Sequence, residues 1–198
     1  HHFVMRDGMP GIDERGNPIG TCGLRGIDRT EDVAHLGMLI GYPHYWGQGY
    51  GAAATQALLE AAKARRLSRF VYASPSSVYG LTPTLPMTET SLLYPLSPYG
   101  VTKLAAEQLC FLYFKNYRVP SLSLRFFTVY GPGQRPDMAF HKFFKAVAED
   151  SPVTIYGDGR QTRDFTFVAD IVQACAAALR LGREGEVYNV GGGHRETL

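Results

Sequence analysis

The chain has 198 residues, of which 45% are hydrophobic and 19% are charged, and its formal net charge is +2. These values are ordinary for an α/β protein, and so small a net charge gives no indication of a nucleic-acid or membrane partner. No apolar run reaches the roughly 18 residues of a membrane span, and the histidines show no metal-ligand spacing. We expect a cytoplasmic protein in which Cys22, Cys110 and Cys175 are buried, reduced thiols.

The first quarter of the chain predicts two strands and a helix. Residues 19–24 and 36–41 are short apolar segments typical of an antiparallel meander, which we place at one edge of the fold. The glycine-dense stretch Trp46-Gly-Gln-Gly-Tyr-Gly51 then leads into a helix over residues 52–64. Such a stretch either caps the helix as a simple turn or binds an anionic group with its amides.

The rest of the chain alternates strands with helices. Residues 69–73, 121–125 and 186–190 predict buried strands, and an apolar stripe predicts a helix from Ser97-Pro98 to Tyr117. Serine before proline is a typical helix start, because the hydroxyl caps free amides and proline fits the first turn. Strand, helix and strand in this order make a parallel βαβ unit. We therefore predict a three-layer α/β fold with a mostly parallel, Rossmann-like sheet and an antiparallel edge from the N-terminal segment.

The start of the predicted 98–117 helix carries the most informative pair of side chains. Tyr99 and Lys103 are four residues apart, so they share one face of the helix. An ammonium beside a phenol lowers the pKa of the phenol and gives a base that can take a proton from an alcohol. The alternative is a surface helix with an unrelated tyrosine and lysine. Ligands of parallel sheets bind beyond the carboxyl ends of the strands, where we expect residues 74–77 and 126–130.

Seven ordered motifs favour the catalytic interpretation. They are Ala73-Ser-Pro-Ser-Ser-Val-Tyr-Gly80, Leu96-Ser-Pro-Tyr-Gly-Val-Thr-Lys103, Arg125-Phe-Phe-Thr-Val-Tyr-Gly-Pro132, Gln134-Arg-Pro-Asp137, Ile155-Tyr-Gly-Asp-Gly159, Arg163-Asp-Phe-Thr-Phe-Val168 and Tyr188-Asn-Val-Gly-Gly192. In order and spacing they resemble the extended short-chain dehydrogenase/reductases, in particular the NAD-dependent nucleotide-sugar epimerases and dehydratases. The resemblance covers residues 57–198.

This resemblance implies a reaction centre, a cofactor and a substrate. Tyr99 would be the general base and Lys103 would hold the nicotinamide ribose of NAD, while a UDP-sugar would be the substrate and a homodimer would form through the 98–117 helix. Arg163 would contact the diphosphate, for which a planar guanidinium is well suited; the alternative is a surface ion pair with Asp164. The implied catalytic residues are Tyr99, Lys103 and Ser76, the implied cofactor contacts are Tyr99, Lys103, Phe126 and Phe127, and the implied substrate contacts are Thr128, Arg163 and Tyr188.

The sequence departs from the family pattern at two places. The third catalytic hydroxyl of the family lies four residues before the tyrosine of the Val-Tyr-Gly motif, and here that position is Pro75. We expect Ser76, or else Ser74, to supply the hydroxyl instead. Before Ala57 no strand is followed by a G-x-x-G-x-x-G phosphate loop at the start of a helix, as the family pattern requires. An inactive family member and a non-catalytic nucleotide-sugar binder or structural remnant therefore remain alternatives.

The glycine-dense stretch and the strands before it resemble the GNAT acetyltransferases over residues 3–67. Trp46 stands where the acetyltransferase signature usually has Gln or Arg. The implied alternative function is an N-acetyltransferase in which Gln48, Gly49 and Gly51 bind acetyl-CoA. We therefore hypothesise a natural or engineered hybrid, with a partial GNAT-like segment over residues 1–56 and an epimerase/dehydratase-like segment over residues 57–198.

Overall fold

A parallel three-stranded sheet forms the centre of the protein. The computed structural model describes residues 2–6, 18–28, 33–40, 45, 48–65, 67–155 and 157–197, and for residues 2–40 it describes the backbone alone. The central strands are β4 (Phe70–Pro75), β5 (Ser121–Phe126) and β8 (Val187–Val190), in the order β4–β5–β8. All of their pairings are parallel. The three strands predicted for the centre of the fold are therefore confirmed.

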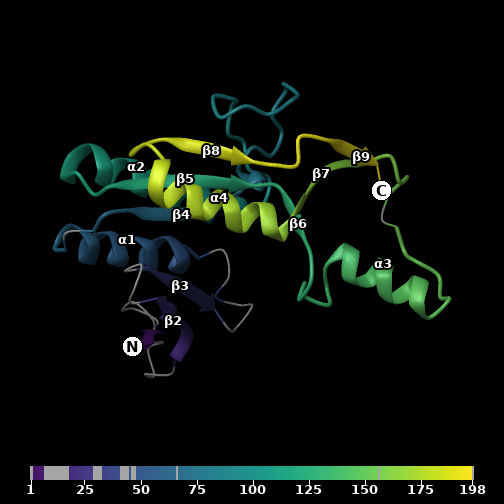
Figure 1. Ribbon diagram of the computed structural model, residues 1–198, viewed down its shortest axis with the longest axis horizontal. Coiled ribbons are helices and arrows are strands. Elements are labelled where there is room, and N and C mark those ends of the chain that lie inside the picture. Colours follow the sequence, from purple (N-terminus) through teal and green to yellow (C-terminus); the bar gives the residue numbers. More distant parts are fainter. Residues whose placement is uncertain are drawn as a thin grey trace.

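Helices cover both faces of this sheet (Figure 1). On one face lie α1 (Tyr50–Lys63) and α2 (Pro98–Tyr117), and on the other lies α4 (Val168–Leu181). The core on the first face contains Leu59, Ala62, Tyr72, Ala106, Cys110, Tyr113 and Val119, and the core on the second contains Leu122, Leu124 and Ala178. Neighbouring residues of a strand point to opposite faces, so β5 places Leu122 and Leu124 in the second core and directs the polar Ser121 and Arg125 toward α2. The predicted three-layer α/β architecture is confirmed.

The bounds of α2 follow from its local sequence. The Ser97 hydroxyl accepts a hydrogen bond from the Gly100 amide at 3.0 Å, and Pro98 occupies the first turn, as predicted. The helix ends where Arg118 adopts a left-handed conformation with φ of 59°. Val119 and Pro120 then lead into β5, because proline cannot continue the helical hydrogen bonds.

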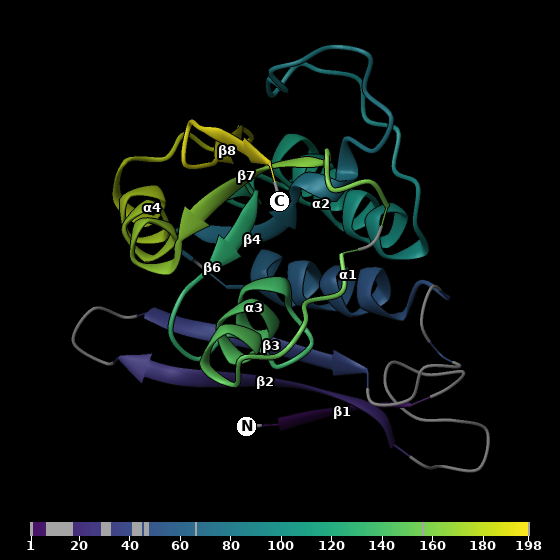
Figure 2. The same ribbon diagram turned by 90° about the vertical axis from the view of Figure 1, so that its right-hand side faces the viewer.

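The N-terminal strands form a sheet of their own. They are β1 (His2–Arg6), β2 (Pro18–Asp28) and β3 (Val33–Ile40), in the order β1–β2–β3, and both pairings are antiparallel. The predicted antiparallel pairing is confirmed, but its placement at an edge of the parallel sheet is wrong. In the described part of the chain these strands pair only with one another, and α1 lies between them and the central sheet (Figure 2).

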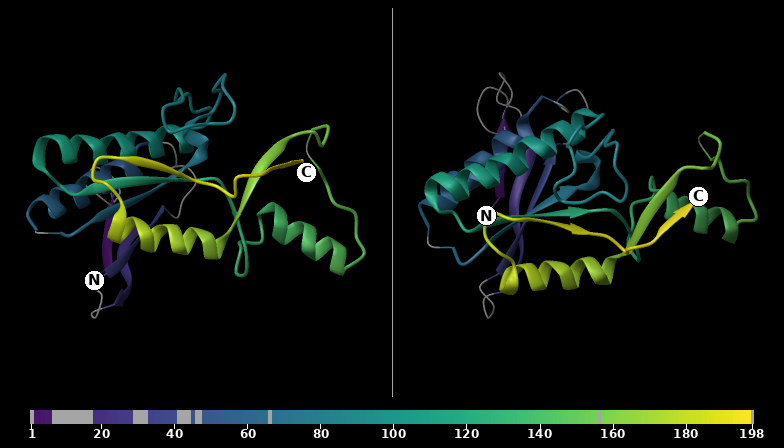
Figure 3. Two further views of the ribbon diagram at one scale, coloured as in Figure 1. Left: turned by 45° about the horizontal axis from the view of Figure 1, so that its top comes forward. Right: turned by 90° about the horizontal axis from the view of Figure 1, so that it is seen from above.

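A second small sheet extends beyond the carboxyl ends of the central strands (Figure 3). It consists of β6 (Thr128–Tyr130), β7 (Thr162–Phe167) and β9 (Arg195–Thr197), in the order β6–β7–β9, and α3 (Ala139–Ala148) follows β6 in the chain. The Asp164 carboxylate accepts hydrogen bonds from the amides of Gly192 at 2.6 Å and Gly193 at 3.0 Å. These bonds join β7 to the turn between β8 and β9. None of the helices in the described residues is long and apolar enough to cross a membrane.

Candidate functional site

The carboxyl ends of the three central strands meet at one edge of the sheet. Pro75 at the end of β4 pairs with Phe126 of β5, which pairs in turn with Val190 of β8. A single 3₁₀ turn, η2 (Ser76–Val78), follows β4 directly. The serine-rich segment therefore lies at the edge where the sequence predicted a ligand site.

The first turn of α2 packs against this edge through a glycine. A Cβ atom at Gly100 would lie 3.0 Å from the Ser77 carbonyl oxygen and 2.9 Å from the Pro95 side chain. A side chain here would therefore push the helix away from the strand end. Gly100 thus allows a close approach that places Tyr99 and Lys103, which flank it on α2, beside the carboxyl end of β4.

Lys103 is held over an aromatic ring. Its ammonium lies 4.6 Å from the centre of the Tyr72 ring, and the Tyr72 hydroxyl donates to the Lys103 carbonyl at 3.4 Å. Burial lowers the pKa of Lys103, although the nearby Cys110 and Glu107 act in the opposite direction. Within the described residues no carboxylate forms a salt bridge with this ammonium. Its hydrogen-bond donors can therefore serve a bound group.

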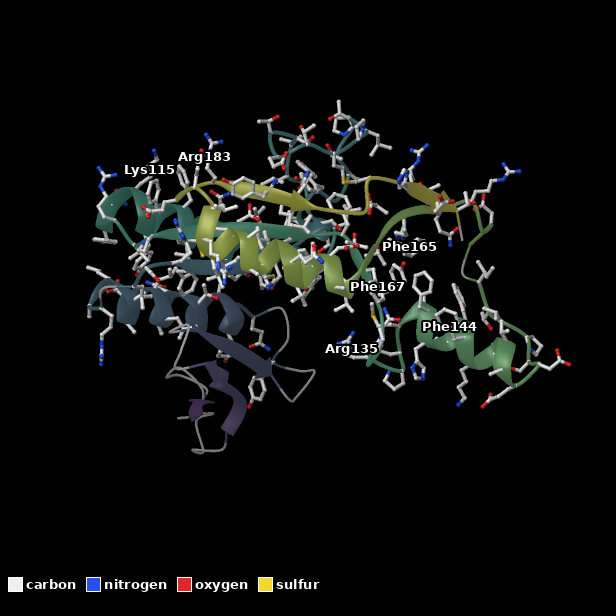
Figure 4. All side chains as sticks on the ribbon, viewed as in Figure 1. Lys115, Arg135, Phe144, Phe165, Phe167 and Arg183 are labelled. Atoms are coloured by element: carbon white, nitrogen blue, oxygen red, sulfur yellow. The ribbon has the colours of Figure 1, made fainter. Side chains whose placement is uncertain are left out.

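Tyr99 is 58% exposed, and its surroundings differ from those expected. Burial raises the pKa of Tyr99, and the charge of Arg135 acts against this increase. The predicted lowering of this pKa by Lys103 is wrong for this structure, since the lysine faces the Tyr72 ring. Arg135 comes from the segment between β6 and α3 (Figure 4) and pairs with Asp137 at 3.0 Å. Sequence reasoning noted the motif that contains Arg135 but gave that residue no role.

The two serines considered for the third hydroxyl differ in their surroundings. Ser74 is buried at the end of β4, and its Oγ has no hydrogen-bond partner among the described residues. Ser76 is half-buried and begins η2, where its carbonyl accepts from the Tyr79 amide at 3.0 Å. Buried hydroxyls normally have a partner. Ser74 therefore has a buried hydroxyl without a partner among the described residues, whereas Ser76 is the more accessible of the two.

The other predicted contacts lie on different faces of the fold. Phe127 lies at the strand edge, with its ring 6.4 Å from that of Tyr79 and its amide bonded to the Val190 carbonyl. Thr128 begins β6 and pairs with Phe165 of β7. The exposed Arg163 lies two residues earlier on β7, so the small sheet carries both residues predicted to meet the nucleotide.

Phe126 and Tyr188 instead pack into the core beneath α4. The Tyr188 hydroxyl accepts from the Arg183 amide at 3.0 Å, near the opposite end of β8 from the strand edge. Because side chains alternate along a strand, the next residue, Asn189, points to the other face. The structure therefore does not bring Phe126 and Tyr188 together with Tyr99, Lys103 and Ser76, and their predicted roles stay predictions.

Sequence reasoning missed a buried polar network at this edge. Arg125 and Glu107 are each 2% exposed. Arg125 donates two hydrogen bonds to the Glu107 carboxylate, from Nε to Oε2 at 3.1 Å and from Nη2 to Oε1 at 2.5 Å. Arg125 also donates to the Tyr79 hydroxyl at 2.8 Å, and that hydroxyl donates to the Asn189 Oδ1 at 2.6 Å. An arginine inside a strand predicted to be buried was the available signal, because a buried charge needs a partner.

An apolar cavity of about 750 Å³ lies between α3 and the small sheet, and four aromatic rings contribute to its lining. The Tyr130 and Phe140 rings stack at 4.7 Å, and Phe144 on α3 and Phe167 on β7 also line the cavity (Figure 4). Gln134, His141 and Lys145 are polar members of the lining, whereas Tyr99 and Lys103 do not belong to it. The described residues contain no cluster of three or more potential metal ligands.

The glycines assigned to acetyl-CoA form the start of α1. Gly49 precedes the helix in a left-handed conformation with φ of 86°, and its carbonyl accepts from the Ala53 amide at 2.9 Å. A Cβ atom at Gly49 or Gly51 would have no neighbour within 4 Å among the described atoms. Gln48 lies in the bend before them, and Trp46 lies outside the described residues. The observed geometry is that of a turn that begins a helix.

Comparisons with known proteins identify relatives of the chain. A sequence profile of the NAD dependent epimerase/dehydratase family matches residues 33–191. The chain is 44% identical over 184 residues to an uncharacterized UDP-glucose epimerase, YtcB, of Bacillus subtilis, which covers 88% of the chain and 56% of the relative. It is 43% identical over 138 residues to the UDP-glucuronate 4-epimerase of Thermodesulfobacterium geofontis, covering 69% of the chain and 42% of that protein.

A solved structure shows the same fold. The UDP-glucuronic acid 4-epimerase of Bacillus cereus, solved with UDP-glucuronic acid and NAD, matches with a TM-score of 0.70 and 50% identity. The match covers 74% of this chain and 47% of the Bacillus cereus chain. This chain thus spans about half the length of the relatives it matches.

The comparisons give no support to the GNAT-like segment, to acetyl-CoA or to a hybrid origin. The family match begins at Val33 and so includes residues 33–56, which we had assigned to an acetyltransferase segment. The match spans most of the chain and agrees with the motifs at the strand edge. The chain therefore belongs to the NAD-dependent epimerase/dehydratase family.

Proposed function

We propose that this chain carries the reaction residues of an NAD-dependent UDP-sugar epimerase of the UDP-glucuronate kind, with Tyr99 as the proton acceptor. The observation that carries the proposal is the position of Tyr99 and Lys103 on the capped first turns of α2. Gly100 between them lets the helix approach the end of β4. Tyr99 is partly exposed, and Lys103 beside it forms no salt bridge with a carboxylate of the described residues. Such a pair is arranged for proton transfer with a bound alcohol.

In this proposal each residue has a separate task. Tyr99 takes the proton of a sugar hydroxyl at its phenol oxygen and later returns it, and Arg135 favours the ionised phenol. Ser76 or Ser74 donates a hydrogen bond to the same sugar oxygen in place of the residue that is Pro75 here. Arg163 and Thr128, which lie on adjacent strands of the small sheet, contact the diphosphate and the nucleotide. The bound UDP-glucuronic acid of the Bacillus cereus relative supports this substrate class.

The residues around Lys103 fit one end of NAD. The ammonium is buried over the Tyr72 ring, which fixes its direction, and its donors suit the hydroxyls of the nicotinamide ribose. Phe127 at the neighbouring strand end offers an apolar surface beside that position. When bound, NAD supplies a hydride acceptor for the sugar carbon and returns the hydride. The G-x-x-G-x-x-G spacing occurs at Gly20, Gly23 and Gly26, but these residues lie within β2 and do not form a turn at the start of a helix, so we assign NAD contacts at the ribose end only.

Thermal unfolding with added ligands tests the proposal. A ligand at 100 times its Kd should stabilise the protein by about 2.7 kcal/mol, which raises Tm by roughly 5–10 °C for a chain of this size. We expect NAD and UDP-glucuronic acid to shift Tm and acetyl-CoA to leave it unchanged. A shift with the UDP-sugar alone would indicate a nucleotide-sugar binder, and a shift with acetyl-CoA alone would contradict the proposal.

Two pairs of variants separate the roles of tyrosine and lysine. We expect the NAD shift to survive Tyr99→Phe and to disappear in Lys103→Met. Tyr117→Phe and Lys115→Met are matched controls at the far end of the same helix and should behave as the wild type. Equal loss of the NAD shift in Lys115→Met would mean that Lys103 has no specific role.

A homodimer through α2 is also part of the proposal. Val101, Phe111 and Leu112 on this helix expose 52%, 45% and 42% of their surface, and an apolar helix face of this kind suits a second copy. Light scattering should give the mass of a dimer, and Leu112→Glu should give that of a monomer. A monomeric wild type at high concentration would rule the dimer out.

A further inference from the structure

The connection over residues 80–96 lies over the edge formed by the carboxyl ends of the central strands, and it contains no helix or strand (Figure 1). It begins directly after η2, which contains Ser76, and it ends at the cap of α2, just before Tyr99. Any displacement of this connection therefore acts on both sides of the proposed reaction centre.

Apolar burial does little to hold the connection in place. Four of its leucines, Leu81, Leu85, Leu92 and Leu96, are between 60% and 66% exposed. Since hydrophobic stabilisation is proportional to the apolar area removed from water, these side chains contribute little. The segment must therefore be fixed mainly by polar contacts.

Polar bonds from the buried network meet the middle of the connection. Arg125 donates to the Glu89 carbonyl at 3.1 Å, and the Asn189 side-chain amide donates to the Met87 carbonyl at 3.0 Å. The Asn189 backbone amide donates to the Glu89 carboxylate at 2.7 Å. Two residues from central strands thus supply three bonds to a segment that has no sheet of its own.

The Tyr79 hydroxyl joins these two donors. It accepts from Arg125 and donates to Asn189, so it fixes the orientation of both side chains. Tyr79 is itself fully buried. Its backbone also takes part, because the Tyr94 amide donates to the Tyr79 carbonyl at 3.2 Å and closes the base of the connection. Hydrogen bonds with an ionised partner in a buried site are among the stronger ones in proteins.

We propose that Tyr79 and Asn189 are positioning residues that hold the 80–96 connection as a preformed wall of the UDP-sugar site. They act through the Met87 and Glu89 contacts and do not touch the reacting atoms. The claim about the wall of a sugar site rests on the proposed function, whereas the claim that the network fixes the connection does not.

Hydrogen exchange measured by mass spectrometry tests the structural part. Tyr79→Phe keeps the buried ring and removes only the bridging oxygen. We expect peptides from residues 81–96 to exchange about tenfold faster in this variant, because a hydrogen bond to a charged group is lost, while peptides from α1 and β5 keep their protection. Tyr94→Phe is the matched control, since it makes the same change at an exposed position of the connection, and it should leave exchange unchanged.

A second variant keeps the test decisive if Tyr79→Phe is too unstable. Asn189→Ala should give the same local acceleration, and the double variant should exchange no faster than the single ones, because both remove one network. Unchanged exchange in residues 81–96, or equal acceleration over the whole central sheet, would overturn the proposal.

Titration of UDP-glucuronic acid tests the functional part. Its affinity should fall about tenfold in Tyr79→Phe, a loss in line with one buried charge-assisted hydrogen bond, and should stay unchanged in Tyr94→Phe. If the wild type fails to bind this ligand while the exchange result holds, the proposed function is refuted and the role of the network in fixing the connection stands. If Tyr79→Phe accelerates exchange in residues 81–96 but leaves the affinity for UDP-glucuronic acid unchanged, the connection is not a wall of the UDP-sugar site.

Discussion

Replacing Glu107 by glutamine should be among the most damaging conservative changes in this protein. Arg125 and Glu107 form an ion pair that is joined by two hydrogen bonds and is almost completely buried. Glutamine has nearly the same shape, but it leaves the guanidinium charge without a counter-charge and presents an NH₂ group to one of its donors. Breaking a buried pair by removing one partner costs about 3–5 kcal/mol. We take the lower value, about 3 kcal/mol, because glutamine can still accept one hydrogen bond.

The expected loss corresponds to a fall in Tm of roughly 6–12 °C for a chain of this size. Urea unfolding followed by circular dichroism should show a lower midpoint with an unchanged m value, because the area exposed on unfolding stays the same. Glu149→Gln is the control: Glu149 pairs with Lys145 at 3.8 Å on the surface, and its loss should change the unfolding free energy by less than about 0.5 kcal/mol. Equal effects of the two substitutions would refute the assigned role of the buried pair.

Three further outcomes follow from packing and burial. Gly100→Ala should destabilise by about 1–3 kcal/mol, because its Cβ would lie 3.0 Å from the Ser77 carbonyl; urea unfolding checks this, and an unchanged midpoint would contradict the close approach. Burial lowers the pKa of Lys103 from 10.5, so at pH values between the lowered pKa and 10.5 the unfolded chain binds more protons than the folded one and stability rises with pH. The unfolding free energy of the wild type should therefore increase relative to that of Lys103→Met as the pH approaches 10.5. A difference between the two proteins that does not change with pH would exclude the effect. Burial raises the pKa of Cys110 to about 12, so iodoacetamide at pH 8 should modify the less buried Cys175 first, as peptide mass spectrometry would show; equal rates would refute this.

Local signals made much of the fold predictable. The Ser97-Pro98 start of α2 and the strand β5 depend on residues within a few positions of each other, and the structure confirms both. The partner of a strand depends on distant contacts, which explains the wrong placement of the N-terminal strands: residues 19–24 and 36–41 showed that they pair, but not which sheet they join. Gly49 carried too little information to separate a helix-starting turn from a phosphate-binding one.

The candidate site shows the same limit at the level of single side chains. The spacing of Tyr99 and Lys103 was sufficient to place both on one helix face, but the ring beneath the lysine belongs to Tyr72, which comes from another strand. Tyr188 was assigned from its position in a family motif, whereas the alternation of β8 presents Asn189 to the buried network. The partnership of Arg125 with Glu107 joins a strand to a helix, so no short motif could reveal it.

The capped start of α2 also has an electrostatic consequence. The aligned peptide dipoles of this helix of 20 residues leave a partial positive charge at its first turn. That turn itself contains no acidic side chain that would neutralise this charge. Tyr99 is the second residue of the helix, and a negative charge that forms on its phenol oxygen during proton transfer would lie near this positive end. The fold thus offers an ionised Tyr99 a fixed, uncharged source of stabilisation that acts against the effect of burial on its pKa.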